Sequence, residues 1–208
     1  MNCIRKHIIS FAMLLMCATS SAQMKWNQSY QTYINQYKDL AIEQMLRYRI
    51  PASITLAQGL FESRAGQSDL ARQGNNHFGI KCHNWTGPTQ YHDDDARGEC
   101  FRVYQDAKES YEDHSRFLAK QPRYSRLFSL NTTDYKGWAH GLKSCGYATN
   151  PQYANKLIQI IELYRLQDYD KAKSYDRFMA THSGTDVPIN AEGTLPPIHI
   201  FNDNYYLY

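Results

Sequence analysis

The sequence predicts a mainly helical α+β domain with one small β-hairpin. Apolar residues recur at helical spacing in several segments of the 208-residue chain, whereas only residues 89–93 and 99–104 resemble short strands. These two segments flank an acidic, glycine-containing run of the kind that favours turns. After about residue 170 the chain becomes polar and rich in Pro and Gly. We therefore expect one domain over residues 26–170 and an irregular tail over residues 171–208.

The first 22 residues resemble a secretory signal peptide. Arg5 and Lys6 precede an apolar run, and Ala22 ends a small-residue pattern typical of a cleavage site. The apolar run is too short for a comfortable membrane span, so we expect no stable one. Lipid attachment at Cys17 is an alternative, although Met16 is an unfavourable residue before a lipidated cysteine. The pattern predicts a periplasmic or secreted protein.

The charge balance argues against a nucleic-acid partner. The chain has 23 Lys and Arg against 20 Asp and Glu, and the predicted signal peptide contains two of the basic residues. The mature chain is therefore close to neutral, and no basic stripe stands out. Long-range charge attraction is not expected to bring this protein to its partner. We expect a monomer.

The helices are predicted in order from apolar spacing and capping residues. In the first helix, residues 26–48, Tyr33, Tyr37 and Ala41 recur at helical intervals. Asp106 and Glu109 have the spacing of a capping box at the start of a later helix. An Asn-Pro pair at residues 150–151 has the order of a helix start. Further helical segments are expected at residues 68–73, 123–130 and 138–142, and from the Asn-Pro pair to about residue 164.

The helix that begins at Pro51 carries the most informative acid of the chain. Pro51 suits a first helical turn, and Gly66 suits the end of a helix. Thr55, Gln58 and Glu62 are spaced at three and four residues, so they form one polar stripe. Glu62 lies near the C-terminal end, where the helix dipole opposes ionisation of a carboxyl group, as a general acid requires. A solvated glutamate on a surface helix is the alternative.

Three segments together resemble the glucosaminidase domain of glycoside hydrolase family 73. They are AQGLFESRAGQSDLARQGNNHFGIKC, CFRVYQDAKESYEDHSRFL and GYATNPQYANKLIQIIELY, and the resemblance covers about residues 30–168. The sequence is similar to flagellar peptidoglycan hydrolase and autolysin glucosaminidase domains. This resemblance implies a lysozyme-like fold, cleavage of the β-1,4 bond between N-acetylglucosamine and N-acetylmuramic acid in peptidoglycan glycan strands, and no cofactor. It also implies that Glu62 is the catalytic acid.

A second catalytic carboxylate is expected on the hairpin. Glycoside hydrolysis normally uses two carboxyl groups, unless the N-acetyl group of the substrate assists. In the family, a glutamate before the hairpin turn supplies the second one, but this chain has Asp93, Asp94 and Asp95, with Glu99 beyond. We predict Asp93 and Asp94 as catalytic candidates. A solvated, turn-forming acidic loop is the alternative.

The resemblance implies further site residues in two other motifs. Tyr147 and Tyr153 match the two tyrosines of the GYAT motif and its continuation, where hydroxyl groups can bind an N-acetyl carbonyl and rings can stack on sugars. We expect Tyr147 to act in catalysis and Tyr153 to bind the substrate or pack in the core. We expect Asn76 and Phe78 to shape the cleft floor, and Gln58 to join them on the substrate-binding side.

Three cysteines remain after signal removal, and an odd number leaves one unpaired within the chain. Cys82 and Cys100 lie on the two sides of the predicted hairpin, so they are the natural disulfide pair, with Cys145 free. Three reduced thiols are an alternative. A zinc site is another, although its spacing matches no standard finger. Its candidate ligands would be His77, Cys82, His83, His92 and Cys100.

Two other functions fit the same resemblance less well. A lytic transglycosylase also uses one glutamate but forms an anhydro sugar, and a catalytically silent domain would only bind the cell wall. The tail, residues 171–208, resembles the lead-in to a small wall-binding module that is not present in the sequence. An intact Glu62 and the acidic hairpin favour an enzyme.

Overall fold

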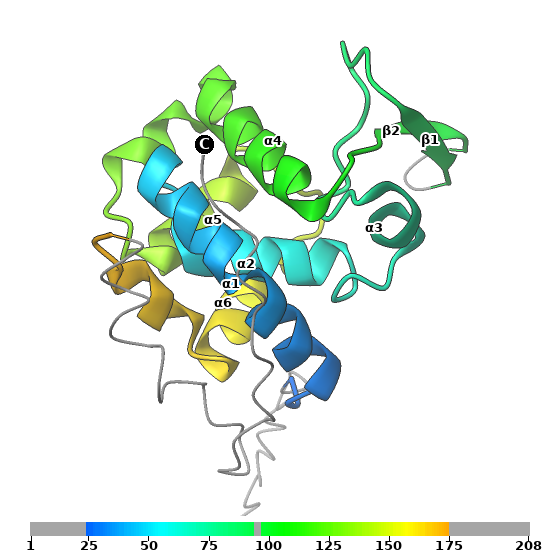
Figure 1. Cartoon of the computed structure of the whole chain (residues 1–208). Coiled ribbons are helices and arrows are strands. Elements are labelled where there is room, and N and C mark those ends of the chain that lie inside the picture. The colour runs from blue at the N-terminus through cyan, green and yellow to red at the C-terminus, as the bar shows by residue number, and fades with distance from the viewer. Residues whose placement is uncertain (1–23, 94–96, 175–208) are drawn as a thin grey trace, which may run out of the picture.

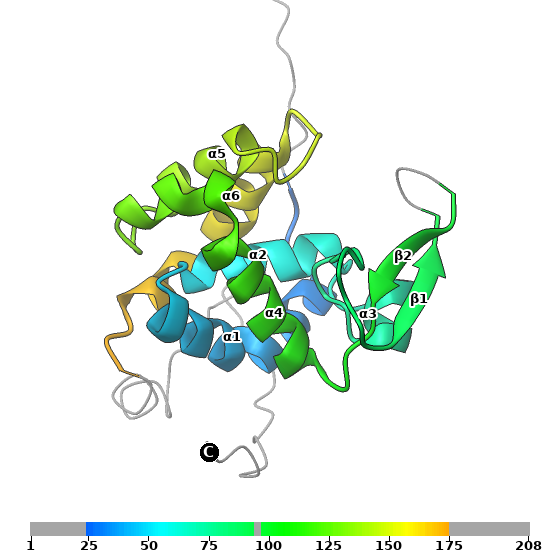
Figure 2. The same cartoon turned by 90° about the horizontal axis from the view of Figure 1, so that it is seen from above.

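A computed structural model describes residues 24–93 and 97–174 (Figure 1). The predicted signal peptide, Asp94, Asp95 and the tail from residue 175 lie outside the described residues. The described part is a body of helices with one antiparallel hairpin projecting at its side (Figures 1 and 2). This arrangement confirms the predicted mainly helical domain.

Helix α2, Ala52–Glu62, lies at the centre of the body. Every residue from position 52 to 60 is buried, including Thr55 and Gln58 of the predicted polar stripe. The alternative of a surface helix is wrong, because other elements enclose α2 and leave only its C-terminal end partly exposed. The enclosing elements are α1 (Gln28–Tyr48), α5 (Tyr135–Ser144), α6 (Tyr153–Leu163) and η2 (Leu166–Lys171).

Side-chain caps fix where several helices begin. The Asn27 carboxamide oxygen accepts from Ser29 N at 2.8 Å, which starts α1 two residues later than expected. Asp106 accepts from Glu109 N at 2.9 Å at the start of α4, Ala107–Lys120. The Glu109 carboxylate reaches back to the N–H group of Gln105 at 2.9 Å. The predicted capping box is therefore confirmed, with its return bond displaced by one residue.

Two predicted helices differ in detail from the structure. The segment expected at residues 123–130 is a 3₁₀ helix, η1, Pro122–Ser129. Asn150 does not cap α6, because its side chain accepts from Gln152 N at 2.8 Å and closes a turn before the helix begins at Tyr153. The short helix α3, Asp69–Gly74, is capped by Ser68.

The hairpin consists of β1, Thr89–His92, and β2, Glu99–Arg102, paired antiparallel. A disulfide joins Cys82 to Cys100 on β2, with the two Cα atoms 5.4 Å apart, and Cys145 is free. This confirms the predicted pairing. Because Cys82 follows the loop that continues from α3, the disulfide attaches the hairpin to the helical body.

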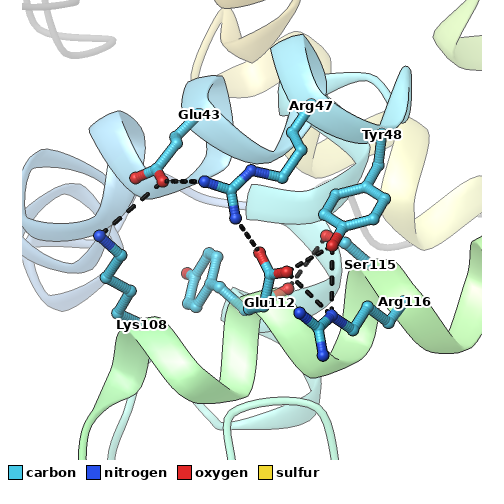
Figure 3. A network of polar contacts seen from close by, with 8 residues as sticks. Glu43, Arg47, Tyr48, Lys108, Glu112, Ser115 and Arg116 are labelled. Atoms are coloured by element: carbon cyan, nitrogen blue, oxygen red, sulfur yellow. Dashed lines mark hydrogen bonds and ion pairs between the residues drawn. The ribbon is translucent and has the colours of Figure 1, made fainter. Parts of the chain in front are cut away.

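A polar network joins α1 to α4 on the outside of the body (Figure 3). At its centre, the Glu112 carboxylate accepts from Arg47 Nη1 at 3.0 Å and from Arg116 Nε at 2.9 Å. Exposed ion pairs contribute little individually, roughly 0–1 kcal/mol, so the network mainly fixes how the two helices meet. Its other members are Glu43, Tyr48 and Lys108.

The start of α2 is capped by a residue far away in the sequence. Pro51 occupies the N-cap position and offers no side-chain hydrogen bond. Instead, the Asp170 carboxylate of η2 accepts from Ser53 N at 2.8 Å and from Ser53 Oγ at 2.6 Å. Burial raises the pKa of Asp170 to about 7, because burial disfavours the charged form more than these bonds favour it.

Candidate active site

A cleft of about 660 Å³ lies where the C-terminal end of α2 meets the hairpin, η1 and the loop before α6. Helix α2 contributes Phe61 and Glu62, and the hairpin contributes His92 and Phe101. Tyr147 lines the cleft from the loop that precedes α6. The hairpin therefore borders the cleft, as expected, and Glu62 lies at the point where segments distant in sequence converge.

Glu62 is the last residue of α2 and is partly buried. The helix ends there and not at Gly66, because the three residues after Ser63 leave the helical conformation. Arg64, Ala65 and Gly66 have φ angles of 52°, 57° and 77°, in the left-handed region. Ser63 supports this turn, since its Oγ accepts from Gly66 N at 2.7 Å. Glu62 thus precedes a tightly fixed turn.

Two tyrosines lie beside Glu62. The Tyr153 hydroxyl accepts from Gln58 Nε2 at 3.0 Å and hydrogen-bonds the Glu62 carboxylate. The rings of Tyr147 and Tyr153 stack with their centroids 5.6 Å apart. Burial raises the pKa of Tyr153 well above its usual value, and the neighbouring Glu62 carboxylate adds to the rise. Tyr153 therefore remains a protonated hydrogen-bond donor at neutral pH.

The surroundings of Tyr147 also favour the protonated form of its hydroxyl. Tyr147 is partly exposed and lines the cleft. Burial raises the pKa of Tyr147 well above its usual value, and the Glu62 charge raises it further. Tyr147 is therefore placed to offer a hydroxyl proton to a ligand in the cleft.

Gln58 and Asn76 lie beneath the cleft and not on its surface. Gln58 is fully buried and donates to Tyr153. Asn76 is 1% exposed, and its carboxamide bonds Ile80 N and O, both at 3.0 Å, and Arg102 O at 2.9 Å. Gln58 thus supports Tyr153 from below, and Asn76 joins Ile80 to Arg102 beneath the cleft. A direct contact of either residue with the substrate stays a prediction.

Phe78 lines the cleft and rests on a buried histidine. Its ring stacks on the His114 ring, with the centroids 4.0 Å apart and the planes at 13°. His114 is fully buried, and this burial lowers its pKa to about 3. A neutral aromatic ring therefore packs beneath Phe78 and holds it at the cleft, where it was expected to form part of the floor.

A buried hydroxyl network beneath the end of α2 was missed by sequence reasoning. Tyr33 OH lies 3.0 Å from His77 Nδ1 and 2.9 Å from Tyr111 OH, and it also hydrogen-bonds Ser63. A Cβ atom at Gly59 would lie 2.6 Å from Tyr33 OH. The glycine in the middle of an apolar helix was the available signal, since it marks a close approach.

The predicted hairpin acids are not gathered around Glu62 in the described residues. Asp93 is exposed at the end of β1 and its Oδ1 accepts from Gly98 N at 2.8 Å, so it closes the hairpin turn. Glu99 forms an ion pair with Lys81 at 2.8 Å. Within residues 24–93 and 97–174, the carboxylates that line the cleft are Glu62 and Asp69. Asp69, at the start of α3, was not among the predicted candidates.

The zinc alternative conflicts with the observed disulfide. Cys82 and Cys100 are bonded to each other, and His77 is hydrogen-bonded to Tyr33. In the described part of the chain, no group of three or more His, Cys, Asp or Glu side chains is arranged to hold a metal.

None of the helices described is both long enough and apolar enough to cross a membrane.

Comparison with known families identifies the domain that forms this cleft. The family model described as mannosyl-glycoprotein endo-beta-N-acetylglucosaminidase matches residues 38–166, more than half of the chain. The chain belongs to the glucosaminidase family. It is therefore a glycoside hydrolase by family, as the three sequence motifs indicated.

Relatives of this glucosaminidase domain occur in several bacteria. Exo-glucosaminidase LytG of Bacillus subtilis (strain 168) is 35% identical over 136 residues, covering 60% of this chain and 48% of LytG. Peptidoglycan hydrolase FlgJ of Vibrio cholerae is 31% identical over 159 residues, covering 69% of this chain and 45% of FlgJ. The glucosaminidase chain thus spans about half the length of these curated relatives.

A solved structure has the same fold as this glucosaminidase domain. The catalytic domain of the autolysin Auto from Listeria monocytogenes superimposes with a TM-score of 0.59 and 30% identity, covering 71% of this chain and 91% of that domain. The likeness confirms the fold class expected from the sequence, a lysozyme-like helical domain with a hairpin beside the cleft.

Proposed function

We propose that this glucosaminidase domain hydrolyses the β-1,4 bond between N-acetylglucosamine and N-acetylmuramic acid in peptidoglycan, with Glu62 as the general acid. The observation that carries the proposal is the position of Glu62, which lines the cleft from the end of α2 beside the Tyr153 hydroxyl. The relatives named peptidoglycan hydrolase support the choice of substrate.

The proposed reaction begins with protonated Glu62. Its carboxyl proton passes to the glycosidic oxygen as the bond from that oxygen to the anomeric carbon breaks, and positive charge develops on the sugar. Tyr153, held by Gln58, fixes the Glu62 carboxyl group through its hydroxyl. Tyr147 is placed to hydrogen-bond the N-acetyl carbonyl of the sugar that is cleaved.

The second catalytic group is assigned to the hairpin in this proposal. The hairpin borders the cleft through His92 and Phe101, and Asp93 directly follows His92 in the sequence. We assign to Asp93 or Asp94 the role of activating water or stabilising the positive charge on the sugar. If neither acts, the N-acetyl group oriented by Tyr147 is the remaining route, since substrate assistance needs no second carboxylate.

The proposed substrate also sets the expected location. Peptidoglycan lies outside the cytoplasmic membrane, so we propose that the protein acts there, periplasmic or secreted. The sequence pattern of residues 1–22 supports export. Lipid attachment at Cys17 is the alternative route to the same compartment.

Product analysis tests the proposal against its rivals. Purified peptidoglycan is digested with the full mature chain, and the fragments are analysed by mass and by the identity of the reducing-end sugar. Hydrolysis at the proposed bond adds one water and leaves N-acetylglucosamine at the new reducing end. Anhydro sugars without added water would identify a lytic transglycosylase, and the absence of any fragments would indicate a wall-binding domain.

A further inference from the structure

An arginine on the cleft wall is held in place by two aromatic rings. Arg123 is the second residue of η1 and lines the cleft together with Phe117 and Tyr124. Its guanidinium carbon lies 4.7 Å from the centroid of the Tyr124 ring and 5.8 Å from that of the Phe117 ring. Stacking of this kind restricts the side chain before any ligand arrives, which reduces the entropy lost on binding.

No carboxylate in the described part of the chain neutralises the Arg123 charge. No ion pair within residues 24–93 and 97–174 includes Arg123. Arg126, on the same 3₁₀ helix, differs because its guanidinium group donates to Ser144 Oγ and to Cys145 Sγ, the latter at 3.3 Å. Arg126 also does not line the cleft. Arg126 therefore serves as the control for Arg123, because both arginines lie on η1 and only Arg123 lines the cleft.

Arg123 lies close to the proposed catalytic residues. Its positive charge opposes the rise in the pKa of Tyr147 that burial and the Glu62 charge produce. Arg123, Tyr147 and Glu62 line the same cleft, and the Tyr124 ring on which Arg123 stacks lies 6.2 Å from the Tyr147 ring, centroid to centroid. A sugar bound at Glu62 and Tyr147 would place a neighbouring part of the strand at Arg123.

The chemistry of the proposed substrate supplies a group that this side chain can bind. N-acetylglucosamine is neutral, whereas each N-acetylmuramic acid carries a lactyl ether whose carboxyl group is free or linked to a peptide with carboxylates of its own. The planar guanidinium group binds carboxylates through paired hydrogen bonds. We infer that Arg123, stacked on Tyr124 and Phe117, is a subsite for a carboxylate of the muramyl unit or its peptide. This inference rests on the proposed function.

The other cationic side chains of the cleft are less suited to this role. Lys81 is paired with Glu99 at 2.8 Å. Arg64 belongs to the left-handed turn after Glu62, so replacing it would disturb the turn itself. Asp69 is the cleft acid that would oppose an anionic ligand, and it lies on α3, not on the wall formed by η1. Arg123 is therefore the residue on which the test is made.

Binding to the full mature chain carrying Glu62→Gln, which prevents cleavage, tests the subsite. Calorimetry gives the Kd for three soluble ligands: strands with stem peptides, the same strands after amide cleavage has freed the lactyl carboxylate, and a neutral β-1,4 oligomer of N-acetylglucosamine. Arg123→Gln, Arg123→Lys and Arg126→Gln are each added to this protein. Arg123→Lys keeps the charge but loses the paired geometry, and Arg126→Gln is the matched control.

We expect Arg123→Gln to weaken binding of an acid-bearing strand about tenfold relative to the neutral oligomer, the order expected for a hydrogen bond to a charged group. Arg123→Lys should fall between, and Arg126→Gln should stay within about twofold. A loss confined to peptide-bearing strands assigns the carboxylate to the peptide, and a loss confined to peptide-free strands assigns it to the lactyl group. An equal loss for all three ligands, or none, would overturn the inference. The proposed function fails separately if the wild-type chain does not hydrolyse the peptide-bearing strands.

Discussion

Glu62 is the centre of a small set of side chains whose roles differ by burial. Tyr153 is 1% exposed, bonded to Gln58 and to Glu62, so it can fix the acid but has little surface to offer a sugar. Tyr147 is more open and faces the cleft. Burial raises the pKa of both tyrosines well above the usual value, so both hydroxyls stay protonated in the alkaline range as well as at neutral pH.

Removing the two hydroxyl groups separately should distinguish these roles. We expect Tyr147→Phe to lower kcat by about tenfold to a hundredfold, because a hydrogen bond to a group that gains charge is worth roughly 1.5–3 kcal/mol. Tyr153→Phe should change the pH dependence of kcat as well, since its hydroxyl bonds Glu62 directly. Steady-state kinetics across pH make the measurement. Identical effects of the two variants on kcat and on its pH profile would contradict this division.

Gly59 is a residue whose lack of a side chain has a specific reason. A Cβ atom there would lie 2.6 Å from Tyr33 OH and 3.1 Å from Tyr111 OH, and neither hydroxyl can move freely because His77 bonds Tyr33 from another side. We expect Gly59→Ala to lower the free energy of unfolding by about 1–3 kcal/mol, as overpacking does. The helix propensity of Ala works against this loss.

A double variant separates the clash from other effects of Gly59→Ala. Tyr33→Phe removes the hydroxyl that the new methyl group would meet, so part of the lost stability should return when the two changes are combined. Denaturant unfolding of the single variants and the double variant gives the coupling energy between the two sites. Strict additivity would show that the Tyr33 hydroxyl does not explain the glycine.

At the scale of elements, the hairpin combines a structural turn with the proposed second carboxylate. Asp93 accepts from Gly98 N at 2.8 Å. Asparagine keeps an oxygen for this bond but has no charge, so Asp93→Asn separates the two roles. We predict that it lowers kcat with little change in KM, as loss of a transition-state interaction does.

The same measurement on neighbouring acids gives the comparison. We predict that the two acids act unequally, so Asp94→Asn should lose much less activity than Asp93→Asn. Asp69→Asn tests the other cleft carboxylate. A large loss at Asp69 alone would move the second role to α3. Small effects at all three positions would move it to the N-acetyl group of the substrate.

Most elements could be predicted from the sequence because their signals are local. Apolar spacing located α1, α2, α4 and α6, and the Asp106 cap and the Cys82–Cys100 disulfide were predicted correctly. Periodicity could not reveal that α2 is enclosed on all sides, since that depends on where other helices pack. The Tyr33 network and the Asp170 cap join residues far apart in sequence, so no local pattern marks them.

At the scale of the whole molecule, a hydrogen bond between two distant parts of the chain fixes the start of the central helix. Asp170 lies 117 positions from Ser53, yet it caps the central helix that ends at Glu62. This cap follows the matched family region, residues 38–166. The first turn of α2 is thus fixed by the last described part of the chain, and its last turn carries the proposed acid.

The buried Asp170 predicts a measurable pH dependence of stability. Its pKa is raised from 3.8 to about 7 in the folded state, so the protonated form favours folding. The stability contributed by protonated Asp170 is complete below about pH 4 and is lost as the pH rises through about 7. We expect the free energy of unfolding of the wild type, relative to Asp170→Asn, to fall over this interval.

Comparison with Asp170→Asn isolates this residue from opposing groups. Burial lowers the pKa of His77 to about 4 and that of His114 to about 3, so their contribution is lost as the pH falls from about 6.5 through these values. These histidines are the same in both proteins and cancel in the difference. Denaturant unfolding at several pH values makes the measurement, and a constant difference between pH 4 and 7 would rule out the buried titration.

Glu62→Gln tests most directly whether Glu62 supplies the proton for glycoside cleavage. Glutamine keeps the size and hydrogen-bonding capacity of the side chain but cannot act as a general acid. The control is Glu162→Gln, an exposed glutamate on α6 paired with Lys136 at 2.8 Å. Hydrolysis of purified peptidoglycan should fall by about 10²- to 10⁴-fold in Glu62→Gln and remain near wild type in the control. Retention of more than roughly a tenth of wild-type activity by a folded Glu62→Gln protein would contradict the account, since general acid help is worth more than this.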